Sequence, residues 1–149
     1  MIPPRWVFRV GWAFHRALFA ASGGRIGAER PRPGKVGTLF LLSTGRKSGT
    51  VRRNALFYLE DGPNLVVVAS NAGADQDPSW WLNLQAWPEA EVELGVDRHW
   101  VRARAATVDE HDRLWPRLVA ANPGYDEYRR ATSRPIAVVV LEPAAAVHG

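Results

Sequence analysis

The chain has 149 residues, 46% of them hydrophobic, and contains no cysteine. This length suits one globular domain that buries roughly two-thirds of its unfolded surface. The lack of cysteine excludes disulfides, thiolate nucleophiles and cysteine-ligated metal sites, so any redox chemistry requires a bound organic cofactor. The formal net charge of +4 combines +10 in residues 1–53 with −6 in residues 54–149. A positive surface for an anionic partner is therefore expected early in the chain.

Residues 6–20 are the first predicted element, an amphipathic helix. Apolar residues fill most of its positions, while Arg5, Arg9 and Arg16 fall within about 40° on a helical wheel. The run is too short to span a bilayer and lacks the pattern of a signal peptide. This helix either packs on the domain or lies on a membrane surface, with its aromatic side chains among the headgroups.

A linker rich in Pro and Gly follows this helix. Residues 1–34 are therefore expected to be an appendage, and residues 35–149 the folded core domain. We expect a cytoplasmic protein, held at the inner face of the cell membrane if residues 5–20 bind lipid.

Short β-type runs begin after the linker, at residues 38–43, 51–60 and 65–70. The turns between them, at 44–49 and 61–64, are too short for parallel crossovers, so the three runs are expected to form an antiparallel meander.

A short helix is predicted next, over residues 79–86, with Asp77 as its N-cap and Pro78 at its first position. A hairpin over residues 91–94 and 99–107 follows it.

The last predicted elements are a helix and a strand. Thr107-Val-Asp-Glu110 has the form of a capping box and starts a helix that Pro116 either kinks or ends early. Residues 136–141 form a wholly apolar final strand. The fold class is therefore mainly β with helices (α+β), a small barrel of about six antiparallel strands with short flanking helices.

Several cofactor and metal sites are excluded by missing motifs. The chain has no G-x-G-x-x-G, and the turn at residues 44–49 lacks the glycine and following helix of a phosphate loop. The four histidines are scattered, so no metal site is expected.

The densest polar segment is Ser43-Thr-Gly-Arg-Lys-Ser-Gly-Thr-Val-Arg-Arg-Asn54. Its two glycines are expected to leave backbone N–H groups free, and four cationic side chains surround them, which suits a phosphate or carboxylate ligand. A solvated basic hairpin is the alternative interpretation.

Five motifs, in order and with their spacing intact, resemble the deazaflavin-dependent nitroreductase family. The motifs are Leu41-Leu-Ser-Thr-Gly-Arg-Lys-Ser-Gly49, Arg53-Asn54, Val67-Val-Ala-Ser70, Asp77-Pro-Ser-Trp-Trp-Leu-Asn-Leu84 and Asn122-Pro-Gly-Tyr-Asp-Glu-Tyr128. The resemblance covers residues 37–142. It implies a split β-barrel of the flavin-mononucleotide-binding type that uses coenzyme F420, an 8-hydroxy-5-deazaflavin with a phospholactyl-oligoglutamate tail, and no metal.

Carried onto this chain, the resemblance assigns the coenzyme's tail to the basic turn and its ring to the end of the third run and the following helix. The implied cofactor-binding residues are Thr44, Gly45, Arg46, Lys47, Ser48, Gly49, Arg53, Asn54, Ala69, Ser70, Pro78, Trp80, Trp81 and Asn83. Neighbouring helical positions point about 100° apart, so at most one of the two tryptophans is expected to face the coenzyme.

Two tyrosines, Tyr125 and Tyr128, match family residues that border the substrate pocket. At i and i+3 they share one face of a turn or short helix. With Ser70 they are the implied catalytic residues, since each hydroxyl can donate a hydrogen bond to the charge that develops on the acceptor. Asn71 and Ala131 stand where relatives often have Lys and an aromatic residue, so substrate preference does not carry over from any one relative.

The resemblance thus implies an F420H2-dependent reductase of the nitroreductase or quinone reductase type. It would transfer a hydride from reduced deazaflavin to a planar, electron-poor acceptor, a quinone or a nitroaromatic compound. The alternatives are a split-barrel protein that binds flavin mononucleotide or haem, and a non-catalytic F420 carrier. Nucleic acid is not expected as a partner, because residues 54–149 are acidic and carry no recognised binding motif.

Overall fold

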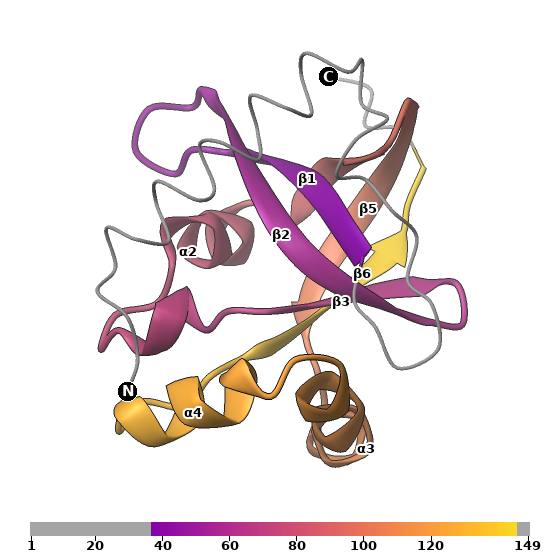
Figure 1. Cartoon of the computed structure of the whole chain (residues 1–149). Coiled ribbons are helices and arrows are strands. Elements are labelled where there is room, and N and C mark those ends of the chain that lie inside the picture. The colour runs from indigo at the N-terminus through magenta and orange to yellow at the C-terminus, as the bar shows by residue number, and fades with distance from the viewer. Residues whose placement is uncertain (1–36, 146–149) are drawn as a thin grey trace.

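The computed structural model describes residues 37–145, whose six strands form a closed antiparallel barrel (Figure 1). The order around the barrel is β1-β2-β3-β6-β5-β4, and β1 closes it by pairing with β4. The strands are β1 (Gly37–Thr44), β2 (Val51–Asp61), β3 (Asn64–Val68), β4 (Glu89–Leu94), β5 (Asp97–Ala105) and β6 (Val138–Pro143). The predicted six-stranded barrel and its β1-β2-β3 meander are confirmed.

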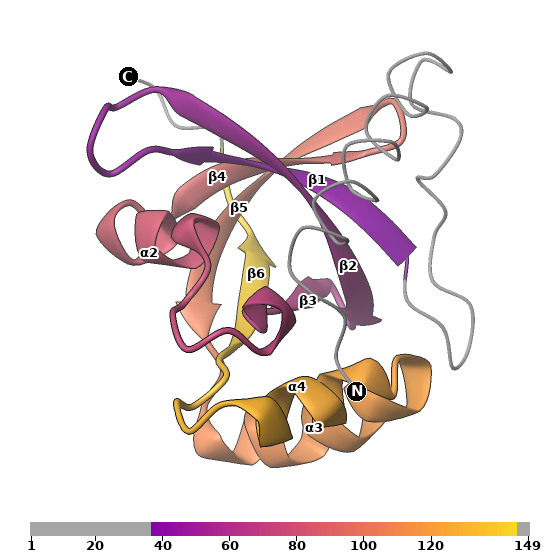
Figure 2. The same cartoon turned by 60° about the vertical axis from the view of Figure 1, so that its left-hand side comes forward.

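Three α-helices and one short 3-10 helix accompany the barrel. They are η1 (Asn71–Gly73), α2 (Ser79–Ala86), α3 (Val108–Ala121) and α4 (Gly124–Ala131). Helix α2 packs on β1 and β5, whereas α3 and α4 lie together beneath the barrel in both views (Figures 1 and 2).

Alternation along the strands produces two hydrophobic cores, one inside the barrel and one outside it. On β3, Val67 belongs to the inner core, which includes Trp81 of α2. Its neighbours Val66 and Val68 belong to the outer core, which includes Leu114 of α3. Successive strand residues point to opposite faces, and here both faces are covered. This double burial explains why β3 and β6 are apolar at nearly every position.

The N-cap prediction for α2 is wrong. The helix begins after Pro78, whose carbonyl accepts from the Trp81 N–H at 3.1 Å, and no side chain caps it. The carboxylate of Asp77 instead pairs with Arg134 at 3.1 Å. Asp77 therefore binds a residue that is distant in the sequence and does not cap α2.

Other boundaries also differ from the sequence predictions. Strand β3 ends at Val68, because Ser70 has helical angles (φ −76°, ψ −31°). The β4–β5 turn is shorter than predicted, since Gly95 adopts φ 64° and β5 already begins at Asp97. Helix α3 continues through Pro116 to Ala121, so the proline does not end it early.

The predicted amphipathic helix over residues 6–20, the linker and the appendage over residues 1–34 lie outside the described residues. Within residues 37–145, no helix has the length and apolar character needed to cross a membrane.

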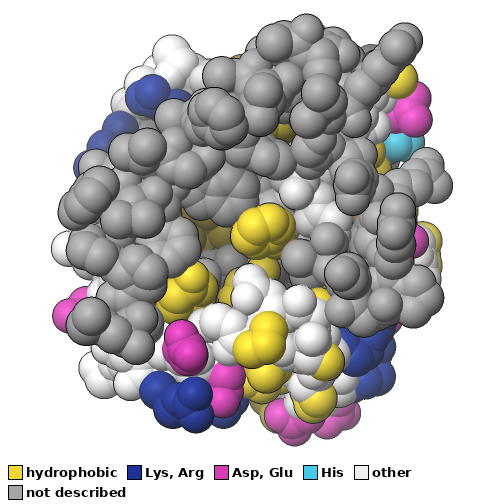
Figure 3. Space-filling model, in the orientation of Figure 1, with side chains coloured by type: hydrophobic (Ala, Val, Ile, Leu, Met, Phe, Trp, Pro, Cys, Tyr) yellow, Lys and Arg dark blue, Asp and Glu magenta, His cyan; other side chains and the backbone are white. Residues whose placement is uncertain are grey.

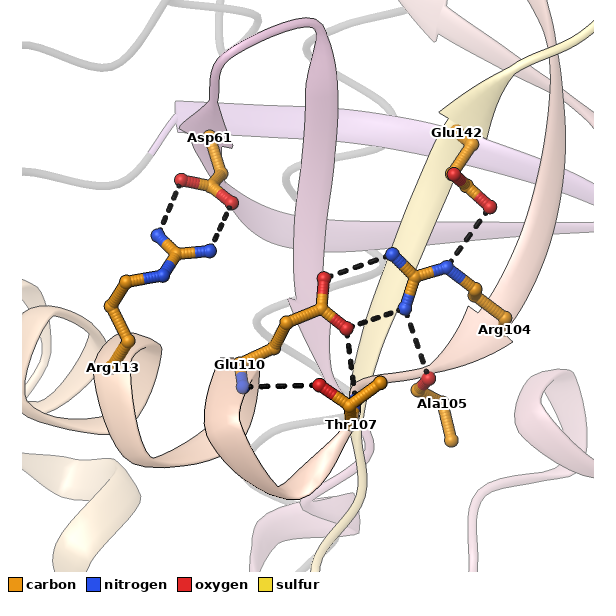
Figure 4. Close-up of polar contacts among 7 residues, drawn as sticks. All are labelled: Asp61, Arg104, Ala105, Thr107, Glu110, Arg113 and Glu142. Atoms are coloured by element: carbon orange, nitrogen blue, oxygen red, sulfur yellow. Dashed lines mark hydrogen bonds and ion pairs between the residues drawn. The ribbon is translucent and has the colours of Figure 1, made fainter.

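The predicted capping box at the start of α3 is present and belongs to a larger polar network (Figure 4). Thr107 Oγ1 accepts from the Glu110 N–H at 3.2 Å, and Glu110 Oε1 accepts from the Thr107 N–H at 2.9 Å. Arg104 donates to both Glu110 oxygens, at 2.6 and 2.9 Å, and to Glu142 at 2.9 Å. The hydrogen bond from Arg104, aided by the Thr107 backbone, lowers the pKa of Glu110 to about 2. The network therefore joins β5, α3 and β6.

This network predicts an acid-dependent loss of stability. The pKa of Glu110 falls from 4.5 to about 2 on folding, so its ionic contribution is complete above about 4.5 and disappears as the pH falls toward 2. At neutral pH we expect Glu110→Gln to unfold more easily by about 1 kcal/mol. In urea unfolding experiments, the difference in the free energy of unfolding between the wild type and Glu110→Gln should shrink as the pH falls from about 4.5 toward 2.

Glu91→Gln is the matched control, since Glu91 forms no ion pair with the residues that the structure describes. A gap between wild type and Glu110→Gln that stays constant with pH would contradict the assignment.

Candidate functional site

A cavity of about 700 Å³ opens between β2, the segment from β3 to α2, and α4. Its volume lies within the range of small-molecule and cofactor sites. The lining residues are Asn54, Ala55, Leu56, Phe57, Val68, Ser70, Asn71, Ala72, Gln76, Asp77, Pro78, Ser79, Trp80, Asn122, Tyr125 and Tyr128. Among residues 37–145, no group of three His, Cys, Asp or Glu side chains could hold a metal ion.

The structure brings part of the predicted site to this cavity. The predicted site residues that line it are Asn54, Ser70, Pro78, Trp80, Tyr125 and Tyr128. They include all three residues expected to be catalytic. Trp80 and Trp81 are both 6% exposed, but only Trp80 is a lining residue, in keeping with their divergent directions on α2.

The basic turn between β1 and β2 lies against α2 rather than in the cavity wall. Arg46 donates to Asn83 Oδ1 from its backbone N–H at 3.1 Å and from its guanidinium at 2.9 Å. Asn83 is only 4% exposed, so a buried amide on α2 holds the turn. Figure 3 shows Lys and Arg side chains gathered over this turn, at the upper left of the view.

The N–H groups of the two turn glycines themselves are bonded within the turn. The Gly45 N–H donates to the Thr50 carbonyl, and the Gly49 N–H donates to the Gly45 carbonyl, both at 2.8 Å. These bonds close the turn, and Gly49 has φ 73°, a conformation that favours glycine. These two N–H groups are therefore not available to an anion.

The remaining predicted tail residues are distributed around the turn. Thr44 ends β1, and Ser48 Oγ lies 2.7 Å from Thr50 Oγ1. The Arg53 guanidinium lies 3.9 Å from the centre of the Phe40 ring, and its Nε donates to Glu93 at 3.3 Å. The structure thus separates Arg53 from the cavity that its neighbour Asn54 lines.

The two tyrosines of α4 differ in burial. Tyr125 is 5% exposed, and this burial raises the pKa of its hydroxyl to about 12, although a side-chain hydrogen bond with Asn122 opposes the rise. Tyr128 is half-buried, and its pKa is raised by desolvation and by the Glu127 carboxylate. Both hydroxyls therefore stay protonated at neutral pH and can donate hydrogen bonds into the cavity.

Asn122 lies beside the first of these hydroxyls. Its Oδ1 accepts from the Gly124 N–H at 3.1 Å, which leaves its amide N–H₂ to face the Tyr125 hydroxyl. A hydroxyl that accepts from Asn122 keeps its own proton available for a ligand.

Sequence reasoning missed Arg134, the residue with the most hydrogen bonds around the site. It follows α4, its side chain is 12% exposed, and it donates to the carbonyls of Ser70 and Ala74 at 2.8 Å. No motif marks it, because its partners lie about sixty residues earlier and are mostly backbone atoms. The apolar wall of Leu56 and Phe57 was also missed, since a strand pattern does not show which face meets a cavity.

The closed six-stranded barrel with its flanking helices defines a class of protein, the split-barrel fold. Within that class, the chain belongs to the F420H(2)-dependent quinone reductase family, whose pattern matches residues 12–143. The resemblance to deazaflavin-dependent reductases is therefore confirmed.

Two relatives from Mycobacterium tuberculosis illustrate the similarity. The chain is 41% identical to Rv3178 over 119 residues, which are 80% of this chain and 98% of the relative. It is 38% identical to the F420H(2)-dependent quinone reductase Rv1261c over 130 residues, which are 85% of this chain and 86% of that one.

Solved structures show the same kinship. The chain resembles an F420-H2 dependent reductase, FDR-A, with a TM-score of 0.65 and 33% identity, over 75% of this chain and 96% of that one. The haem storage protein HutZ from Vibrio cholerae matches with a TM-score of 0.55 but only 11% identity, so it shares the fold alone. The haem and flavin mononucleotide alternatives are not favoured.

Proposed function

We propose that this protein is an F420H2-dependent reductase that transfers a hydride to a quinone in the cavity beside α4. The observation that carries the proposal is the cavity itself, which Trp80, Tyr125 and Tyr128 line in a chain of the quinone reductase family. When bound in its reduced form, the deazaflavin supplies a hydride to an electron-poor acceptor.

The residues of the cavity suit a planar ring system. Leu56, Phe57 and Trp80 offer apolar and aromatic surface, which planar ligands pack against favourably. Asn54 and Ser70 provide polar groups that can fix the orientation of a ring. A nitroaromatic acceptor has the same planar, electron-poor character, and the family favours the quinone.

The basic turn suits the anionic tail of the coenzyme. Lys47 and Arg52 are exposed there, and guanidinium and ammonium groups bind phosphate and carboxylate oxygens. Arg46 has a second role in this proposal, since its bonds to Asn83 join the tail site to the helix that carries Trp80.

The tyrosines would act on the acceptor. A protonated hydroxyl can donate to the quinone oxygen on which negative charge develops. Tyr125 is nearly buried and suits this hydrogen bond, whereas the half-buried Tyr128 can also exchange its proton with water. Holding the reacting atoms roughly 3–3.5 Å apart is the larger part of the protein's contribution.

Binding and turnover of the full-length protein test this function. Titration with F420 and, separately, with flavin mononucleotide should show preferential binding of the deazaflavin. Steady-state oxidation of reduced F420 with menadione should follow. Preference for flavin mononucleotide would refute the cofactor, and deazaflavin binding without oxidation would indicate a carrier.

Tyr128→Phe tests the role of the half-buried tyrosine. Loss of one hydrogen bond to the transition state, about 1.4 kcal/mol, should lower kcat about tenfold. The dissociation constant for F420 should change far less, because the hydroxyl is assigned to the acceptor. Unchanged kcat with menadione would remove Tyr128 from the reaction.

Lys47→Ala tests the basic turn without disturbing Asn83. Lys47 forms no ion pair with residues 37–145, so its removal should leave the fold intact. We expect about fivefold weaker F420 binding, about 1 kcal/mol, with a smaller dependence on salt. Arg98→Ala, in the β4–β5 hairpin, is the control, and equal weakening by both variants would contradict a local tail site.

We also propose that residues 5–20 hold the protein at the inner face of the cell membrane, where a lipid quinone is dissolved. The support is the sequence pattern of aromatic residues beside an arginine stripe. Full-length protein should sediment with anionic vesicles, and Arg9→Glu with Arg16→Glu should weaken this about tenfold or more. Arg98→Glu should have little effect. Equal association of all three proteins would contradict the proposal.

A further inference from the structure

Arg134 binds residues that form one wall of the cavity but does not line the cavity itself. Its guanidinium donates to the Ala69 carbonyl at 3.3 Å, to the Ser70 and Ala74 carbonyls at 2.8 Å, and to Asp77 Oδ1 at 3.1 Å. It also donates to the Pro135 carbonyl at 3.3 Å. The segment of residues 69–77 is thus tied at four points to one side chain. Its members Ser70, Asn71, Ala72, Gln76 and Asp77 line the cavity, and Arg134 does not.

This segment has a conformation that its own residues do not favour. Asn71, Ala72 and Gly73 follow one another with φ of 45°, 54° and 78°. The left-handed region is unfavourable for residues with a Cβ, so it persists only where surrounding contacts impose it. Within the segment the backbone forms two hydrogen bonds, from Gly73 to Ser70 at 2.9 Å and from Ala74 to Asn71 at 3.1 Å.

The carbonyls that Arg134 binds determine where the neighbouring N–H groups point. In a trans peptide the carbonyl and the N–H point in opposite directions, and the described residues contain no cis peptide. Because the carbonyls of Ala69 and Ser70 face Arg134, the N–H groups of Ser70 and Asn71 point away from it. The helical angles of Ser70 keep the two peptides nearly parallel. Both residues line the cavity, and Arg134 does not.

The same segment is fitted against the helix that carries the tyrosines. A Cβ on Gly73 would lie 3.1 Å from the Ala131 Cβ and 3.3 Å from the Tyr128 Cα. Thr132 Oγ1 donates to Asp75 at 3.0 Å and accepts from the Arg134 N–H at 3.3 Å. Helices η1 and α4 lie close together in both cartoon views (Figures 1 and 2). The position of the segment and the position of Tyr128 are therefore coupled.

We propose that Arg134 is a positioning residue for the reaction: by binding the carbonyls of Ala69, Ser70 and Ala74, it aims the Ser70 and Asn71 N–H groups into the cavity. Paired backbone donors of this kind stabilise an oxygen that gains negative charge during a reaction. This inference rests on the proposed function. Arg134 touches neither coenzyme nor quinone, and it acts through the segment that it holds.

Arg134→Lys is the informative variant. A lysine keeps the charge beside Asp77, but a single ammonium cannot reproduce the planar fork that spans several carbonyls. Arg113→Lys is the matched control, since Arg113 also forms a two-point pair, with Asp61 at 2.8 and 2.9 Å (Figure 4), and neither residue lines the cavity.

The first measurement is amide hydrogen exchange of the full-length protein without ligand. The Gly73 and Ala74 amides should exchange about tenfold faster in Arg134→Lys, while amides of the β3–β6 ladder stay unchanged. The Arg113→Lys protein should match the wild type at Gly73 and Ala74. Unchanged exchange in Arg134→Lys would overturn the anchoring.

The second measurement is kinetic. In Arg134→Lys, kcat with menadione should fall about tenfold per coenzyme-bound molecule, because the backbone donors to the developing charge have moved. In Arg134→Ala, added guanidinium should restore part of kcat relative to equal sodium chloride. A variant that melts earlier but keeps its kcat would show a merely structural arginine.

The two measurements separate the two ideas. A wild-type protein that neither binds nor oxidises reduced F420 would refute the proposed function and the catalytic part of this inference, whatever the exchange rates. If the wild type binds and oxidises reduced F420, either unchanged Gly73 and Ala74 exchange or normal turnover in Arg134→Lys would refute the positioning role and leave the proposed function standing.

Discussion

The antiparallel ladder between β3 and β6 is the constraint on which most of this structure depends. Val66 pairs with Val140 and Val68 pairs with Val138, and these two strands separate the inner core from the outer one. Past the end of the sheet the pairing continues, with the Ala69 N–H donating to the Ala137 carbonyl at 2.9 Å. This bond holds the segment after β3 beside the segment before β6 where both leave the barrel. It brings the segment after Ala69 next to the residues that precede β6.

The site follows from this exit. The segment after β3 supplies Ser70 and the left-handed turn. The segment before β6 supplies Arg134 and, just before it, helix α4 with the two tyrosines. The outer core fixes α4 by burying Tyr125 against Leu114 and Leu118 of α3. A hydroxyl that is buried in this way keeps its proton, because its anion would be poorly solvated. Core packing and the chemistry of the cavity are thus two results of one arrangement.

The charges of the protein are divided between roles. The ion pairs of α3 and α4 are partly exposed, and such pairs contribute little stability individually. In Figure 3 the lower edge, formed by these helices, shows Lys and Arg mixed with Asp and Glu. The cationic side chains over the β1–β2 turn are therefore the more distinctive feature of this face.

Much of the fold could be predicted from the sequence, because the relevant interactions are local. Short connections require antiparallel strands, the Thr107–Glu110 spacing specifies a capping box, and helical geometry separates the directions of Trp80 and Trp81. The family motifs identified the reductase class and named six residues that line the cavity. What the sequence determined by itself was the set of strands, the barrel and the family.

Only the tertiary structure decided how the site is held. Asp77 has the sequence of a helix cap, but Arg134, 57 residues away, takes its carboxylate. Asn83 binds Arg46 across 37 residues, and Arg134 reaches the Ala69 carbonyl across 65. Patterns of residue spacing describe contacts within a few positions of the chain. Contacts made by side chains with distant backbone carbonyls leave no such pattern, so they become visible only when the barrel has closed.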